Sequence, residues 1–174
     1  AGGNTGGFSA AWLGSSPALD LRADMAWAAK AYKTLSTFFG DTAQRPYRFF
    51  LRVLPESTTS GGTAGNRSFM LQVPVRPRRS TSGGDGTGLR SIVAHEMIHG
   101  WAGSFEGAGP WASEGLATYF TANLQRRLGL QPLTAFVAEL NRLSRQYHGN
   151  PYRDATNDAA TAAFWADKNG ELLP

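Results

Sequence analysis

The segment VAHEMIHGWAG at positions 93–103 carries residue types that can bind a metal and activate water. In a helix, His95 and His99 lie one turn apart, so both imidazoles project from one face at about the separation that a single Zn²⁺ requires. Glu96 lies about 100° round the helix from His95. The H-E-x-x-H pattern assigns such a glutamate to a metal-bound water rather than to the metal. Because Zn²⁺ lowers the pKa of such a water and a carboxylate can take its proton, this spacing indicates metal-dependent hydrolysis.

The same residues also have a simpler interpretation. His95 and His99 would then be helix residues satisfied by their neighbours, and Glu96 would be a solvated surface residue. A third protein ligand separates the two interpretations, since a catalytic zinc site needs three protein ligands and one open position.

Glu114 is the residue that we expect to be the third ligand. In GPWASEGLATYF, Pro110 precedes a second helix and Glu114 lies in its first turn. An antiparallel pair of helices would bring this carboxylate to the two histidines. Glu106, His148 and Asp85 remain alternatives, although their contexts favour a solvated loop residue, a surface residue and a helix cap, respectively.

The periodicity of apolar residues predicts the elements that position these side chains. Spacings of three and four predict a helix between Asp20, its N-cap, and Gly40, its stop, whereas alternation predicts strands at 47–55 and 67–75. From residue 88 the periodicity is helical, with helices predicted at 88–102, 111–128, 133–147 and 157–168. Strands followed by helices predict an α+β fold.

Three segments without periodicity connect these elements. Residues 1–18, rich in Gly and Ser, are predicted to be a flexible lead-in to one domain over 19–174. Residues 56–66 are predicted to be a turn-rich connection, and 76–88 a long loop of the kind that rims functional sites.

Composition narrows the partners and the compartment. The 174 residues include no cysteine, so a metal must be bound by His, Asp or Glu, and no apolar run approaches the roughly 20 residues that span a membrane. Net charge is +4, but the arginine run of Arg76, Arg78 and Arg79 is a short surface feature, so we expect no nucleic-acid partner. The cysteine-free, Arg-rich and Gly/Ser-rich character favours an extracytoplasmic setting, periplasmic or secreted, over a cytoplasmic one.

HEMIHGW followed by PWASEGLATYF resembles the two-part signature of the gluzincins, the thermolysin-like zinc peptidases whose third ligand is a glutamate. Trp101 and the W-x-S-E-G-x-x-x-Y pattern are most similar to the glycyl aminopeptidase family, and more distantly to the aminopeptidase N family. The similarity covers residues 61–120 and extends weakly through PYRFFLRVLP.

This resemblance implies that His95, His99 and Glu114 bind one zinc ion, with Glu96 as general base and proton shuttle. It also implies a thermolysin-like catalytic domain, in which a small sheet precedes the helices, and a peptide or protein substrate. The strand at 67–75 would pair with the main chain of that substrate.

The chain departs from the family pattern in two places. A glycine-rich segment ahead of the zinc-binding helix usually supplies a glutamate for the substrate's amino group, and Ala64 stands where that carboxylate is expected. A tyrosine well after the third ligand usually stabilises the oxyanion, whereas this chain stops at NGELLP. Tyr147 and Tyr152 lie in a predicted turn, and Tyr119 is expected to pack on its own helix. The resemblance therefore implies a catalytic domain truncated at both ends.

These residues predict zinc-dependent hydrolysis of peptide bonds, with aminopeptidase activity as a finer form. The departures motivate an alternative of another class, a zinc-containing domain that binds peptides without turnover. A third possibility, a helical domain with a basic surface and no metal, requires both motifs to be coincidental.

Overall fold

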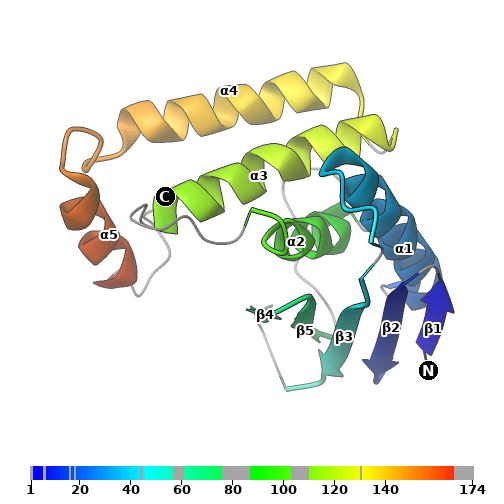
Figure 1. The fold of residues 1–174 in the computed structure, drawn as a ribbon. Coiled ribbons are helices and arrows are strands. Elements are labelled where there is room, and N and C mark those ends of the chain that lie inside the picture. The colour runs from blue at the N-terminus through cyan, green and yellow to red at the C-terminus, as the bar shows by residue number, and fades with distance from the viewer. Residues whose placement is uncertain are drawn as a thin grey trace. The chain divides into compact units, whose positions relative to one another are not determined.

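The fold is given by a computed structural model that describes residues 2–5, 7–15, 17, 19–43, 45–56, 61–75, 87–102, 110–129 and 131–166. They belong to two compact units, Ala1–Trp101 and Ala102–Pro174. The first unit contains a sheet and two helices, and the second contains helices (Figure 1). The predicted α+β fold is confirmed. The prediction of one domain over 19–174 stays a prediction.

The first unit is built on a five-stranded sheet. Its order is β1-β2-β3-β5-β4, in which β2, β3 and β5 run parallel and the outer strands β1 and β4 are antiparallel to their neighbours. The strands are β1 (Gly2–Thr5), β2 (Phe8–Leu13), β3 (Tyr47–Leu54), β4 (Gly61–Gly65) and β5 (Ser68–Pro74).

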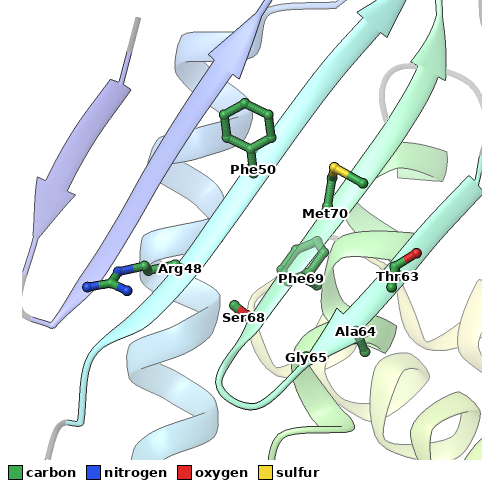
Figure 2. Close-up of a pocket in the computed structure, with 8 residues that line it drawn as sticks. All are labelled: Arg48, Phe50, Thr63, Ala64, Gly65, Ser68, Phe69 and Met70. Carbon is green, nitrogen blue, oxygen red and sulfur yellow. The ribbon is translucent and has the colours of Figure 1, made fainter.

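Two helices cover one face of this sheet. Helix α1 (Leu21–Phe38) connects β2 to β3 and contacts β2, while α2 (Thr87–Ile98) contacts β5 and β4. Figure 2, viewed from the open face, shows both helices behind the strands. Every second residue of β3 and β5 points toward the helices and forms the core between sheet and helices. These residues are at most 6% exposed: Phe49, Leu51, Val53, Phe69, Leu71 and Val73.

The predictions of α1, β3 and β5 are confirmed, whereas α2 ends at Ile98 instead of at the predicted residue 102. The sequence also identified one helix cap. The Asp20 side chain accepts a hydrogen bond from the Ala23 amide at 3.0 Å, as an N-cap does. Gly40 follows the helix with a φ of 66°, a conformation that favours glycine.

Two predictions about connecting segments are wrong. The predicted lead-in contains β1 and β2, and Phe8 of β2 is 2% exposed because β2 pairs in parallel with β3. The predicted connection at 56–66 contains β4, which pairs with β5. Both segments are rich in glycine, so main-chain pairing with the next strand, rather than a local apolar pattern, stabilises β1 and β4.

The second unit consists of α3 (Pro110–Arg127), α4 (Leu133–Gly149) and α5 (Asn157–Ala166), which agree closely with the predicted helices. Helix α3 contacts both α4 and α5, and its buried residues include Ala117, Ala122 and Leu124. In the part of the chain that the structure describes, every helix is too short or too polar to cross a membrane.

Candidate metal centre

Helix α2 presents its two sides to different surroundings. Val93, Ala94, Met97 and Ile98 are at most 2% exposed and fix the helix on the unit. His95, Glu96 and the following His99 are only partly buried. Because positions three and four apart share a face, the apolar residues anchor α2 and leave the polar residues beside the core rather than within it.

The two histidines retain helical spacing even though α2 ends between them. The helix ends at Ile98, but the His99 amide still donates a hydrogen bond to the His95 carbonyl at 3.4 Å. The two rings are 4.9 Å apart between centroids at 81°, and each offers a ligand nitrogen within 4.8 Å of the other. Tetrahedral zinc with Zn–N bonds of about 2.0–2.1 Å needs nitrogens about 3.3 Å apart, which side-chain rotation can reach. The two imidazoles therefore fit a single metal ion.

The Glu96 carboxylate faces the outer strand β4. A Cβ placed on Gly62 would lie 3.3 Å from Glu96 Oε1 and 3.5 Å from the Met70 carbonyl oxygen. A glycine at this position lets the backbone of β4 approach the carboxylate closely. The candidate base thus lies beside a strand whose five residues are all exposed.

The backbone of Glu96 is held by a buried tyrosine. The Tyr47 hydroxyl donates a hydrogen bond to the Glu96 carbonyl oxygen at 3.3 Å, and the Tyr47 side chain is 1% exposed. Burial raises the pKa of Tyr47 above its usual value, and the negative charge of Glu96 raises it further, so the hydroxyl stays a donor. The sequence analysis missed this contact, although the inward position of Tyr47 in the alternation of β3 is a signal for it.

The strand predicted to pair with substrate is the wrong one. Residues 68–72 of β5 pair with β3 on one side and with β4 on the other, so their main-chain groups are already used. β4 is the outer strand instead, and it carries four small residues and one threonine. Ala64, where a carboxylate was expected, lies within β4 opposite Phe69.

Glu114 belongs to the second unit. It is partly buried on α3, and since that helix begins at Pro110, Glu114 lies in the second turn rather than the predicted first. That it joins the two histidines stays a prediction. Of the alternative ligands, Glu106 and Asp85 lie outside the described residues, and His148 is exposed in the last turn of α4.

The candidate tyrosines of the second unit are largely exposed. Tyr119 on α3 is 49% exposed and contacts Phe120 edge-on, so packing accounts for only part of its side chain. Tyr147 is 60% exposed and lies within α4, which runs two residues past its predicted end, so its placement in a turn is wrong. Tyr152, 39% exposed, does lie in a turn.

A shallow hollow lies on the open face of the sheet, away from the helix that carries the histidines (Figure 2). Phe50 and Met70 stand side by side over adjacent strands, with Thr63 beyond them on β4. Because α2 contacts the opposite face, this hollow is separate from the Glu96 carboxylate. Its full lining is Arg48, Phe50, Thr63, Ala64, Gly65, Ser68, Phe69 and Met70.

Comparison with known proteins identifies a fold class. No family model matches the sequence, and no curated protein sequence matches it. Solved structures do match, and this likeness shows a mixed α+β fold.

One of these structures is an aminopeptidase N family protein from Idiomarina loihiensis. It superposes with a TM-score of 0.57 at 21% sequence identity, over 74% of this chain and 25% of that chain. At this identity the likeness shows the fold alone. The chain therefore spans about a quarter of the length of the protein it resembles.

Proposed function

We propose that this chain carries the metal-binding part of a gluzincin-type peptidase and that it hydrolyses peptide bonds with zinc. The observation that carries the proposal is the arrangement around α2, where two imidazoles close enough to share a metal ion lie beside a carboxylate that faces an exposed outer strand. The fold shared with part of an aminopeptidase N family protein supports it.

His95, His99 and Glu114 are the proposed zinc ligands. Together they offer two imidazole nitrogens and one carboxylate oxygen, the donor set of a catalytic zinc site that keeps one position open. When bound, zinc would act as a Lewis acid that polarises the scissile carbonyl and acidifies the attacking water.

Glu96 is the proposed general base. Its carboxylate takes a proton from the attacking water and delivers it to the nitrogen of the leaving amine, so that one residue serves both proton transfers. The hydrogen bond from Tyr47 to the Glu96 carbonyl holds the backbone from which this side chain projects.

The outer strand β4 is the proposed substrate-binding edge. An extended peptide pairs with such an edge through main-chain hydrogen bonds, which bind many sequences with little selection by side chain. Gly62 would bring the paired backbone next to Glu96. A bound peptide would therefore lie with a carbonyl group within reach of the base and the metal.

A second candidate, a zinc-containing domain that binds peptides without turnover, is favoured by Ala64. That methyl group stands where the aminopeptidases have the carboxylate that binds a free amino group. The same substitution bears on the finer proposal of aminopeptidase activity. Comparison of free and N-acetylated peptides tests it, because an aminopeptidase cleaves only the free form.

The test of the proposed function is the pair of variants Glu96→Gln and Glu56→Gln. We expect the wild-type chain to retain one zinc ion after dialysis and to cleave peptides. Glu96→Gln should keep the zinc and lose about 10²–10⁴-fold in turnover, since a general base is removed. Glu56→Gln, the same change at an exposed turn, should resemble wild type.

Equal turnover by the two variants would refute the general-base role of Glu96. Stoichiometric zinc together with peptide binding but no cleavage by wild type would favour the non-catalytic alternative. A wild-type chain that retains no zinc would refute both.

A further inference from the structure

A group of side chains holds the turn that follows α2, and apart from Tyr47 the proposed reaction does not use them. The Trp101 cluster, as we call it, brings together five residues from separate parts of the first unit: Tyr32, Asp41, Tyr47, Arg67 and Trp101. Trp101 comes two residues after His99, so the cluster lies directly next to the candidate metal centre in sequence.

Asp41 is the polar centre of the cluster. One of its oxygens accepts hydrogen bonds from the Trp101 indole N–H at 3.1 Å and from the Arg67 guanidinium at 2.9 Å. The side chains of Asp41 and Arg67 are 7% and 17% exposed, so the ion pair is largely shielded from water. Burial raises the pKa of Asp41, but the bonds from Arg67 and Trp101 outweigh it, and the carboxyl pKa lies below its usual value.

Aromatic rings also hold Trp101 in place. The Trp101 ring stacks on Tyr47 at 6.2 Å with an interplanar angle of 5°, and Tyr32 lies 5.7 Å from the same ring. A Cβ on Gly100 would lie 3.2 Å from the Tyr47 ring, so a side chain there would push the two apart. The turn that follows α2 is therefore packed closely against β3.

The same cluster also fixes β4. Arg67 lies between β4 and β5 with a φ of 57°, and its carbonyl accepts a hydrogen bond from the Arg48 amide at 3.0 Å. Its guanidinium bonds to Asp41 and to the Tyr32 hydroxyl at 3.1 Å. One arginine thus ties the hairpin that holds Gly62 to the group that holds the end of α2.

We propose that Asp41 and Arg67 are positioning residues that set the distance between the Glu96 carboxylate and the outer strand β4. Asp41 and Arg67 contact neither the Glu96 carboxylate nor the outer edge of β4. They connect the segment that follows α2 to the hairpin of β4 and β5. The expected effect on kcat rests on the proposed function. The expected order of the turn at residues 98–101 does not depend on it.

The first unit offers a matched control at the other end of α2. Asp24 of α1 accepts a hydrogen bond from Arg90 at 2.8 Å, and these side chains are 6% and 25% exposed. This ion pair resembles the Asp41–Arg67 pair in length and shielding. Arg90 precedes Glu96 by six residues, about 9 Å along the helix, so its loss should destabilise the unit without loosening the turn that follows α2.

The experiment compares Asp41→Asn with Asp24→Asn in the full chain. Hydrogen exchange is measured on the amides of 98–101 in the zinc-free protein, and kcat and KM are measured with zinc present. Relative to Asp24→Asn, we expect Asp41→Asn to speed exchange of these amides about tenfold or more. We also expect it to lower kcat about tenfold with little change in KM, as misplacement of a base does.

Trp101→Phe is the milder second variant, since it removes the indole N–H and keeps an aromatic ring. It should show the same pattern at smaller amplitude. If both ion-pair variants change exchange and kcat equally at equal stability, the positioning role is wrong. If the wild-type chain shows no turnover, the proposed function fails, and the exchange rates still decide the inference.

Discussion

The contact between Gly62 and Glu96 makes a direct prediction about activity. In Gly62→Ala the added methyl carbon would lie 3.3 Å from Glu96 Oε1, slightly closer than the ordinary contact range of 3.4–4 Å. The methyl carbon would also lie 3.5 Å from the Met70 carbonyl oxygen, which belongs to the backbone of the neighbouring strand. The carboxylate must therefore shift by a few tenths of an ångström.

This displacement translates into a modest but measurable loss. A misplacement of about 1 Å in an active site costs on the order of 10²-fold, so a few tenths of an ångström should lower kcat about 3- to 10-fold. That loss corresponds to about 0.7–1.4 kcal/mol in the activation barrier. Folding should not suffer, because Gly→Ala at a compatible position stabilises by about 0.4–1 kcal/mol through the unfolded chain.

The assay compares kcat of Gly62→Ala with that of Gly61→Ala under zinc saturation. Gly61 lies on the same strand, and a Cβ there meets no atom within 4 Å. The loss at position 62 should exceed that at position 61, while the urea midpoints of the two variants agree. Equal kcat values would refute the claim that β4 lies against the catalytic carboxylate.

Three further predictions test other parts of the account. Asp41→Asn should weaken the fall in unfolding free energy at acidic pH, measured by urea unfolding. The pKa of Asp41 is lowered in the folded protein, so its contribution to stability is complete above the ordinary pKa of 3.8 and is lost as the pH falls through the folded pKa. Tyr47→Phe should cost about 0.5–1.5 kcal/mol in unfolding free energy, the net value of a hydrogen bond, and a cost near zero would contradict the bond to Glu96. Leu71→Ala, at a side chain 0% exposed, should cost about 2–5 kcal/mol in the same assay, whereas less than about 1 kcal/mol would place Leu71 outside the core.

Local sequence patterns predicted those parts of the fold whose signal is local. Strands β3 and β5 bury every second residue, and helix α1 has an aspartate cap, so apolar periodicity and end signals were sufficient for them. Strands β1 and β4 were missed because their glycines leave no alternation to detect. Main-chain pairing with the adjacent strands β2 and β5 holds them instead.

The candidate site also has a part that the sequence predicted and a part that it did not. The spacing of His95, Glu96 and His99 is a property of one helix, so the sequence predicted that the imidazoles would approach each other. The surroundings of Glu96 come from Gly62 and Tyr47, which lie on different strands and meet the carboxylate and the carbonyl only after the sheet forms. No periodicity in the chain encodes such contacts.

The outer strand of the sheet is a functional feature that local sequence patterns do not predict. A resemblance can imply that a strand binds substrate, but which strand has a free edge depends on the order of the whole sheet. Here the antiparallel return of β4 covers β5 and presents its own edge instead. The proposed substrate-binding edge is therefore the glycine-rich strand β4 and not the apolar strand β5.

The most direct test of the central claim is turnover measured as zinc is returned to the metal-free chain. Zinc is removed with a chelator, excess chelator is dialysed away, and peptide hydrolysis is followed during titration with zinc. If the central claim is right, hydrolysis is negligible without metal and rises linearly until one zinc ion is bound per chain. Hydrolysis that survives complete removal of zinc would contradict it.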